Sequence, residues 1–387
     1  MTEMVFGAVA VKASEPAVSR WWRTVDRWTL AAIVILFVIG ILLGLAASPP
    51  LAARNGKDVF YYVGRQGFFG MASLLVMVIV SIQDPQRIKR WAVVLFLITL
   101  VTLLFLPVFG TNFGKGAMRW YSLGFMSFQP SEFIKPVFVV AMAWLMSASN
   151  DIAGPPGKTL SFGVTVLVVF ILAMQPDFGQ ATLVLFSWVL MFFIAGAPKK
   201  LMIAVGAITA MAGMAAYNSS EHFARRINGF LSGEIDPTTQ IGFATEAIQE
   251  GGFFGVGIGQ GSVKWSLPDA HTDFIIAVAA EEFGLVLCLF IIALFMFITI
   301  RSLLRLRRER DPFTRLAGVG LAVLLGMQAF INLGVSVRLL PTKGMTLPFI
   351  SNGGSSMLAI GVLLGMMLAL TRHRPQNDMA EIMGRGH

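Results

Sequence analysis

The segment FIIAVAAEEFGLVLCLFIIALFMFITI, residues 274–300, decides the class of fold. It is long enough to cross the hydrocarbon core of a bilayer as a helix, which takes about 20 apolar residues. Its two charged residues, Glu281 and Glu282, are adjacent, and adjacent residues on a helix differ in direction by about 100°. Both carboxylates cannot face lipid, so both need polar surroundings inside the membrane.

The whole chain has 387 residues, of which 56% are hydrophobic and 13% charged. A soluble domain carries about a quarter charged residues, so this chain has too few polar side chains to cover a surface in water. The composition excludes a soluble enzyme, a disordered chain and a fibrous repeat, and the solid apolar runs argue against an outer-membrane β-barrel. The single Cys288 excludes an internal disulfide. The sequence predicts an all-α, polytopic membrane protein.

Ten apolar segments are predicted to cross the membrane. They are residues 29–48, 62–82, 91–109, 132–148, 159–175, 179–197, 200–217, 274–300, 316–337 and 347–371. The two spans that flank Gln175–Pro176–Asp177 could also be counted as one broken hairpin. Residues 29–372 would form the transmembrane domain, with cytoplasmic tails at 1–28 and 373–387.

The basic residues predict the orientation. With the N-terminus in the cytoplasm, most of the 30 Lys and Arg residues fall in cytoplasmic segments, which fits the positive-inside rule. The net charge of +9 is then explained by loops that face anionic lipid, and no nucleic acid is expected. Residues 218–273 would form a long outer loop between the seventh and eighth spans. Because this loop is acidic and not of low complexity, we expect it to be ordered and functional.

Two groups of polar residues at helix ends have both a structural and a functional interpretation. In the first group, which begins at Arg119, Ser131 could cap the fourth helix, and Glu132 and Lys135 are spaced to form an ion pair. In the second group, Asp177 lies in a Pro–Asp turn and could cap the following helix. The first group leaves both interpretations open, whereas for Asp177 the spacing alone favours a cap.

Acidic residues also gather where the outer loop enters the eighth span. Asp273 could cap that helix, but a cap does not explain Asp269, His271 or the two glutamates. Glu281 lies about 12 Å deeper than Asp273 at 1.5 Å per residue. The pattern therefore favours a functional site. It indicates a metal site only weakly, because His271 has no second histidine nearby.

The last span is preceded by PTKGMTLPFISNGGSS, residues 341–356, which is unsuited to a lipid-facing helix. Irregular backbone at that depth is tolerated where it lines a cavity or is buried in protein; a flexible loop is the alternative. Arg338 and Lys343 place positive charge beside exposed backbone N–H groups, and Ser351 adds a hydroxyl, which suits an anion. Together the four groups predict one membrane-level cavity for an anionic amphipathic ligand, with possible acid–base chemistry.

These groups, in this order, resemble the SEDS family of shape, elongation, division and sporulation proteins. The resemblance extends from about Trp28 to Arg372, and the run Lys264 to His271 looks more like the division branch than the elongation branch. The matching motifs are Arg119–Trp120, Gln129–Pro130–Ser131–Glu132 with Lys135, Pro176–Asp177–Phe178–Gly179, Leu267 to Phe274 with Glu281–Glu282–Phe283–Gly284, and Lys343–Gly344 through Ser355–Ser356.

The resemblance implies a peptidoglycan glycosyltransferase at the outer face of the bacterial inner membrane, at the division septum. It would polymerise lipid II and release undecaprenyl diphosphate. Asp273 would be the essential aspartate, and its carboxylate suits a general base for the acceptor hydroxyl. The expected substrate-binding residues are Arg119, Glu132, Lys135, Asp177, Asp269, His271, Glu281, Glu282, Arg338, Lys343 and Ser351.

The resemblance also implies partners. They are a class B penicillin-binding protein, which is the septal transpeptidase, and other divisome proteins, besides the membrane lipids. A divalent cation, Mg²⁺ or Mn²⁺, could stabilise the departing diphosphate.

Residue chemistry alone leaves two other functions open. Intramembrane charges and broken helices serve a lipid flippase or transporter equally well. A non-enzymatic scaffold of the division machinery would need the outer acidic residues only for folding or docking.

Overall fold

Each of the ten segments that were predicted to cross the membrane corresponds to a helix in the structure. The computed structural model describes residues 16–111, 118–124, 126–149, 151, 154–197, 199–233, 236–341 and 344–373. Within these ranges seven helices are long and apolar enough to cross a membrane, and α9 and α15 are shorter apolar helices. The prediction of an all-α, polytopic membrane protein is confirmed. The ten helices are α3 (Arg27–Arg54), α4 (Tyr61–Ile82), α5 (Pro85–Leu104), α7 (Pro130–Ala148), α8 (Gly157–Met174), α9 (Phe178–Ile194), α10 (Lys199–Ser219), α13 (Ile275–Leu306), α14 (Pro312–Ser336) and α15 (Gly354–Leu370).

Side-chain burial follows the pattern of a membrane protein. Large apolar side chains such as Leu75 and Phe170 face outward, whereas polar ones such as Gln66 are buried. Because lipid is as apolar as leucine, close packing and internal hydrogen bonds hold the helices together. Gln66 of α4 shows this, since its amide donates to the carbonyl oxygens of Gly40 at 2.9 Å and Ile350 at 3.0 Å.

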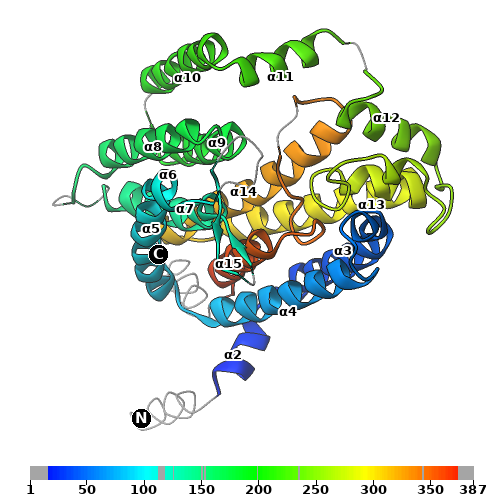
Figure 1. The fold of residues 1–387 in the computed structure, drawn as a ribbon. Coiled ribbons are helices and arrows are strands. Elements are labelled where there is room, and N and C mark those ends of the chain that lie inside the picture. The colour runs from blue at the N-terminus through cyan, green and yellow to red at the C-terminus, as the bar shows by residue number, and fades with distance from the viewer. Residues whose placement is uncertain are drawn as a thin grey trace.

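Helices α7 and α15 form the centre of the bundle (Figure 1). Helix α15 packs along α4, and α7 lies between α5 and α14. Gly361 and Gly365 allow the close approach of α15 to α4: a Cβ atom on Gly361 would lie 2.5 Å from the carbonyl oxygen of Ser73, and one on Gly365 would lie 2.8 Å from that of Met77. Small residues four apart are a common device for helix packing in membranes.

The long loop that is predicted to lie outside is largely helical in its described residues. It contains α11 (Glu221–Leu231), α12 (Gln240–Gly251) and a 3-10 turn at Val263–Trp265. Helices α10 and α11 lie at the edge of the molecule (Figure 1). The last span differs from its prediction, because its helix begins at Gly354 and residues 347–353 before it are non-helical, with a turn at 348–350. A short α6 (Leu106–Phe109) and a two-stranded hairpin, β1 (Tyr121–Ser122) and β2 (Ser127–Phe128), lie between α5 and α7.

Helix α13 is broken at Gly284, where φ is 78° and ψ is −176°. An L side chain would be strained there, and a Cβ atom would lie 2.3 Å from the carbonyl oxygen of Phe253. Residues 252–257 satisfy the backbone groups that the break releases. Leu285 N–H donates to Gly252 at 3.0 Å, and Val256 N–H donates to the carbonyl of Glu281 at 2.8 Å. Broken helices persist in membranes when protein re-satisfies their backbone in this way.

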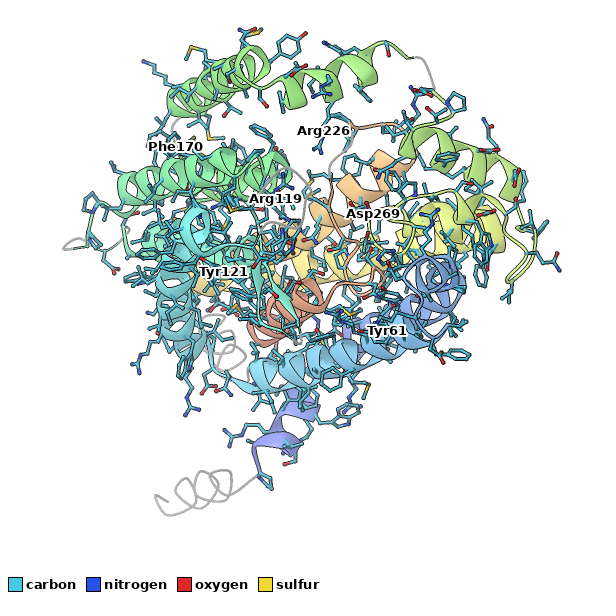
Figure 2. The ribbon with its side chains drawn as sticks, in the orientation of Figure 1. Tyr61, Arg119, Tyr121, Phe170, Arg226 and Asp269 are labelled. Carbon is cyan, nitrogen blue, oxygen red and sulfur yellow. The ribbon has the colours of Figure 1, made fainter. Side chains whose placement is uncertain are left out.

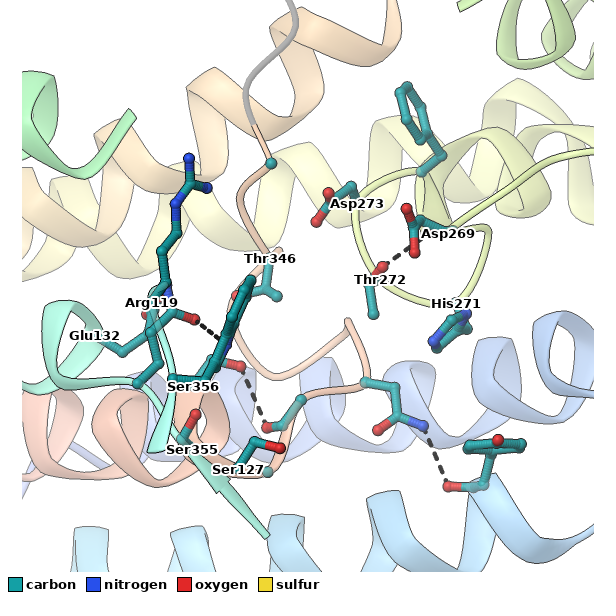
Figure 3. Close-up of a pocket in the computed structure, with 18 of the residues that line it drawn as sticks. Arg119, Ser127, Glu132, Asp269, His271, Thr272, Asp273, Thr346, Ser355 and Ser356 are labelled. Atoms are coloured by element: carbon teal, nitrogen blue, oxygen red, sulfur yellow. Dashed lines mark hydrogen bonds between the residues drawn. The ribbon is translucent and has the colours of Figure 1, made fainter. Parts of the chain in front are cut away.

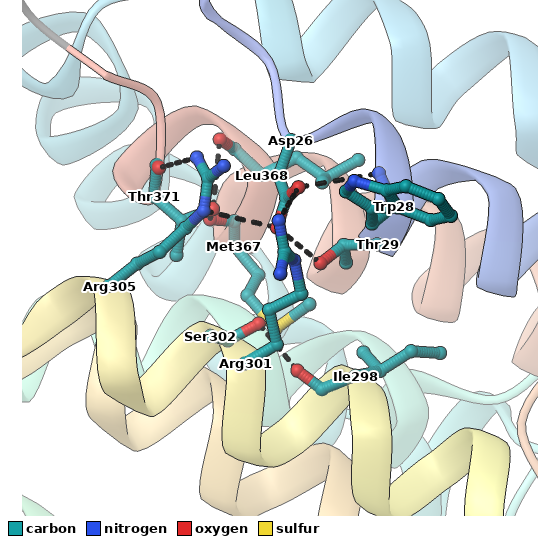
Figure 4. Close-up of polar contacts among 10 residues, drawn as sticks. All are labelled: Asp26, Trp28, Thr29, Ile298, Arg301, Ser302, Arg305, Met367, Leu368 and Thr371. Atoms are coloured by element: carbon teal, nitrogen blue, oxygen red, sulfur yellow. Dashed lines mark hydrogen bonds and ion pairs between the residues drawn. The ribbon is translucent and has the colours of Figure 1, made fainter.

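At the far end of the bundle from Asp273, Asp26 joins α3 to α13 (Figure 4). Its carboxylate accepts hydrogen bonds from Arg301 at 2.6 and 2.9 Å and forms an ion pair with Arg305 at 3.1 Å. It also accepts from Thr29, at the start of α3, at 2.8 Å. Burial favours the neutral acid, but the hydrogen bonds from Arg301 and Thr29 and the charge of Arg305 outweigh it and lower the pKa of Asp26.

Candidate functional site

A cavity of about 650 Å³ opens among the residues that precede α13 and α15 (Figure 3). Its walls come from the first turns of α4, the hairpin, α7, α11, the start of α12, the loop at 269–274 and the segment 344–356. Of the predicted site residues that the structure describes, five line it: Arg119, Glu132, Asp269, His271 and Asp273. Figure 3 shows Asp269 and Asp273 on one side and Arg119 and Glu132 on the other. Residues far apart in sequence thus meet at one site.

Asp273 is held in place through its backbone. The amide of Asn332, on α14, donates to the carbonyl oxygen of Asp273 at 3.0 Å and to that of Met345 at 2.6 Å. The carboxylate lies against Gly344, where a Cβ atom would approach its Oδ2 to 3.1 Å. The residue at the N-cap position of α13 is Phe274. Asp273 is therefore not the N-cap residue of this helix.

Two irregular segments are tied together beside Asp273. The hydroxyl of Ser351 donates to the carbonyl of Thr272 at 2.5 Å and accepts from the N–H of Leu347 at 2.8 Å. The N–H of Asn352 donates to the carbonyl of His271 at 2.9 Å. Ser351 is buried and does not line the cavity; it joins the segment before α15 to the loop that carries Asp273.

Two residues of these segments have left-handed backbone conformations, Asp269 with φ 56° and Phe349 with φ 61°. Such conformations cost about 1–3 kcal/mol each and cluster at functional sites. The bonds just described are what hold this backbone in its shape.

The group around Glu132 forms a largely buried network, from which Arg119, Trp120, Gln129 and Glu132 reach the cavity. Lys135 donates to Glu132 at 2.8 Å, which confirms the predicted pair, and to Gln328 of α14 at 3.1 Å. Arg119 donates to the carbonyl oxygens of Gln175 at 3.2 Å and Pro176 at 2.6 Å. The network therefore fixes the position of the Arg119 guanidinium.

The two helix caps predicted in this region are not formed. Ser131 is the second residue of α7, after Pro130, and its hydroxyl donates to Asp177 at 3.1 Å. Asp177 stands at the N-cap position of α9, but its side chain makes no cap bond there. Both side chains instead join α7 to the turn before α9, and Asp177 lies behind the cavity wall rather than on it.

Glu281 and Glu282 are buried as predicted but do not line the cavity. Glu281 accepts from the backbone N–H groups of Val263 at 2.7 Å and Lys264 at 3.1 Å. Glu282 forms an ion pair with Lys264 and accepts from Gly259 N–H at 2.9 Å. Both carboxylates therefore hold the outer loop against α13.

Lys264 also connects the outer loop to α3. Its ammonium donates to the carbonyl of Ala46 at 3.1 Å. That carbonyl lacks its usual helical partner because Pro50, four residues on, has no N–H. The proline in α3 thus creates the acceptor that the outer loop uses.

Of the two basic residues predicted near the last span, the structure describes only Arg338. Arg338 donates to the carbonyl of Gly233 at 3.2 Å and does not line the cavity. Lys343 lies outside the residues that the structure describes.

Two arginines that the sequence analysis did not single out do line the cavity, Arg65 of α4 and Arg226 of α11. Arg65 occurs at the start of the second span, so the rule for charges at membrane depth could have found it. Arg226 follows the similar Arg225 in the outer loop, and the sequence does not distinguish them. In Figure 2, Arg226 points from α11 toward the bundle. Burial and the charge of Arg119 lower the pKa of Arg226, against the charges of Asp177 and Asp273, but a guanidinium stays charged.

Metal ligands do not converge in the described part of the chain. No three His, Cys, Asp or Glu side chains there are grouped so that they could hold a metal ion. The divalent cation stays a prediction from the sequence.

A comparison with known protein families identifies the family to which this chain belongs. The family model of the FtsW, RodA and SpoVE cell cycle proteins matches residues 27–376. The chain belongs to this family. These are the SEDS proteins, so the family resemblance read from the motifs is confirmed.

Curated SEDS relatives are similar over almost the whole chain. The probable peptidoglycan glycosyltransferase FtsW of Caulobacter vibrioides is 42% identical, over 94% of this chain and 93% of that protein. The probable peptidoglycan glycosyltransferase FtsW of Geobacter sp. strain M18 is 36% identical, over 88% and 96%.

Solved SEDS structures share the fold. A chain from a peptidoglycan synthase complex that coordinates polymerization and crosslinking matches with a TM-score of 0.72 and 26% identity, over 90% of this chain and 97% of that one. The rod shape determining protein RodA of Thermus thermophilus matches with a TM-score of 0.65 and 25% identity, with the same coverage.

Proposed function

We propose that this SEDS protein is a peptidoglycan glycosyltransferase of the division branch, which polymerises lipid II into glycan strands. One observation carries the proposal: Asp273, preceded by an irregular loop and held by Asn332, lines a cavity that it shares with Arg65, Arg119 and Arg226. A carboxylate and several fixed cations are what this transfer needs. The names of the curated relatives support the same reaction.

Asp273 is the proposed general base. The acceptor sugar hydroxyl is a poor nucleophile until its proton is removed, and a positioned carboxylate can accept that proton in the transition state. As the O–H bond breaks, the oxygen forms a bond to the anomeric carbon of the donor. The bond from that carbon to the diphosphate breaks, and undecaprenyl diphosphate leaves with the electron pair. A single displacement inverts the anomeric centre and gives a β-1,4 link from an α-linked donor.

The arginines of the cavity are proposed to hold the diphosphate. Negative charge grows on the leaving group, and donors that are fixed before the reaction stabilise it without reorganisation. Arg119 is fixed by the carbonyl oxygens of Gln175 and Pro176, and it stands across the cavity from Asp273. Guanidinium groups also match phosphate oxygens in pairs of hydrogen bonds. A divalent cation would add positive charge at the same place.

The buried polar residues are proposed to act at a distance. Lys135, Asp177, Glu281, Glu282 and Ser351 do not line the cavity. Their bonds support the residues that do, as do fixed supporting shells around other sites.

Location and partners follow from the same proposal. The cavity would open on the outer face of the bacterial inner membrane at the division septum, because positive-inside loops leave the Asp273 end outside. A class B penicillin-binding protein would crosslink the strands as partner. The structural likeness to a chain of a peptidoglycan synthase complex supports such a partner.

Purified protein with its transpeptidase, given lipid II in detergent, tests the proposal. Without membrane sidedness only a polymerase yields a product, so we expect glycan ladders. Lipid transfer across vesicles without ladders under any condition would support the transporter instead. Transpeptidase binding with neither activity would support the scaffold.

A further inference from the structure

A second, apolar groove lies on the other side of the hairpin from the polar cavity. Its volume is about 520 Å³, within the range of about 300–1,000 Å³ that is usual for ligand pockets. It lies between the end of α5, α6 and the hairpin. Apolar side chains form most of its wall: Val101, Phe105, Phe109, Tyr121, Leu123 and Phe128.

Residues of the hairpin line both sites, and around the second strand they alternate between the two. Successive side chains on a strand point to opposite faces. Just before the first strand, Trp120 lines the polar cavity, whereas Tyr121 and Ser122 of the strand itself both line the groove. In the second strand Ser127 and Gln129 line the cavity, and Phe128 between them lines the groove. The hairpin region thus contributes the polar side chains of Ser127 and Gln129 to the candidate active site and the rings of Tyr121 and Phe128 to the groove.

Hydrogen bonds fix the hairpin to α5 and to Thr111, which follows α6. The hydroxyl of Tyr121 donates to the carbonyl of Thr102 at 2.6 Å, and the hydroxyl of Thr111 accepts from Ser122 N–H at 3.2 Å. The rings of Tyr121 and Phe128 stack with centroids 6.5 Å apart. The groove is therefore formed before any ligand enters.

The depth of the groove matches one leaflet of the bilayer. The basic end of α5 stops at Arg90, and Val101 and Phe105 lie about 17 and 23 Å further along the helix. A hydrocarbon core is about 30 Å thick, so the groove lies in the leaflet nearer the Asp273 end. Phe105 is 52% exposed and Leu123 is 51% exposed, so the groove continues into the lipid-facing surface of α5.

We propose that the groove binds the polyprenyl chain of a lipid-linked substrate whose diphosphate lies in the polar cavity. The inference rests on the proposed function and adds a site for the apolar part of the molecule. A ligand that is a diphosphate at one end and a long hydrocarbon chain at the other fits two sites of matching chemistry that the hairpin region lines. Binding the chain orients the donor and increases its local concentration at Asp273.

The test compares two substrates in lipid nanodiscs: full-length lipid II and an analogue with a short, water-soluble chain. Phe105→Ala removes part of the groove wall. We expect kcat/KM for full-length lipid II to fall on the order of tenfold, mainly through KM, because apolar contact is lost. The short-chain analogue should react as with wild-type protein. Phe170→Ala on α8, which removes an equally lipid-exposed ring (61% exposed), should change neither value.

Three results would overturn the inference, two from the kinetics and one from binding. Equal loss for both substrates would mean that Phe105 supports the fold or the cavity, and no loss for either would mean that the groove holds only ordinary membrane lipid. Equilibrium binding of undecaprenyl diphosphate separates this inference from the proposed function. If wild-type protein binds it, Phe105→Ala weakens that binding and neither polymerises, the proposed reaction fails and the groove stands. If Phe105→Ala binds as tightly as wild type, the groove inference fails.

Discussion

The side-chain amide of Asn332 lies 3.0 Å from the backbone carbonyl oxygen of Asp273, and donates to it. The same amide donates to Met345 at 2.6 Å, so one residue of α14 holds two edges of the cavity. Asn332 is buried, and its contact with Asp273 is to the backbone and not to the carboxylate. It therefore positions the carboxylate without touching the substrate. We interpret Asn332 as a positioning residue.

Replacing Asn332 should therefore slow the reaction without weakening substrate binding. In Asn332→Ala we expect kcat to fall on the order of a hundredfold with little change in KM, since a displacement of about 1 Å at the reacting groups costs that much. Steady-state kinetics checks this. Ser336→Ala, one turn further along α14, is the control, because the Ser336 hydroxyl bonds within the helix to the carbonyl of Asn332. An unchanged kcat in folded Asn332→Ala would contradict the interpretation.

Arg226 and Arg225 offer a matched pair of adjacent arginines. Arg226 lines the cavity, whereas the side chain of Arg225 is 72% exposed and pairs with Glu221 at 3.9 Å. We expect Arg226→Gln to raise KM for lipid II on the order of tenfold, because a charge-assisted bond to phosphate is lost. Arg225→Gln should have the kinetics of the wild-type protein. Similar effects of the two substitutions would show that general charge, and not the cavity, is responsible.

The ion pair between Lys264 and Glu282 makes a prediction about stability. Both side chains are buried, so Lys264→Met leaves an unpaired carboxylate and should destabilise the protein by about 3–5 kcal/mol. The double variant Lys264→Met with Glu282→Gln removes that charge and should recover a good part of the loss. Thermal unfolding in detergent measures both. If the double variant is as unstable as the sum of its single variants, the two groups do not act as a pair.

The lowered pKa of Asp26 leads to a prediction of how the stability of the protein depends on pH. The pKa of this carboxyl is lowered in the folded protein, so its contribution is present above the ordinary value of 3.8 and is lost as the pH falls below it. We expect the wild-type melting temperature to fall between about pH 5 and about pH 3, with part of this fall absent in Asp26→Asn. At neutral pH the variant should lose about 1–3 kcal/mol, since Arg301 and Arg305 are partly exposed. An identical acid dependence in both proteins would contradict this role.

Local sequence was enough to predict the helices. A run of about 20 apolar residues has few alternatives in a membrane, so the ten spans match ten helices. Acidic residues inside a membrane need polar partners, and Glu281 and Glu282 have them in a backbone N–H group and a lysine. The direction in which these side chains point could not be predicted from the sequence. Spacing does not show that the acceptor for Lys264 is a carbonyl released by a proline in α3.

The candidate site was predicted in part for the same reason. Asp269, His271 and Asp273 share one loop with the cavity, so a local pattern found them. Arg226 reaches the cavity only because the helix α11 turns it inward, and Asn332 was hidden in an apolar helix that gave no signal in the sequence. Both depend on tertiary packing, which single-residue spacing does not encode.

The rate of glycan polymerisation by Asp273→Asn tests the central claim most directly, with lipid II binding measured on the same sample. If the carboxylate removes the acceptor proton, kcat falls by about 10²–10⁴-fold while lipid II still binds. Asp236→Asn, which changes an exposed aspartate of the same outer loop, should retain the wild-type rate. Polymerisation by Asp273→Asn at the wild-type rate would show that Asp273 is not the base.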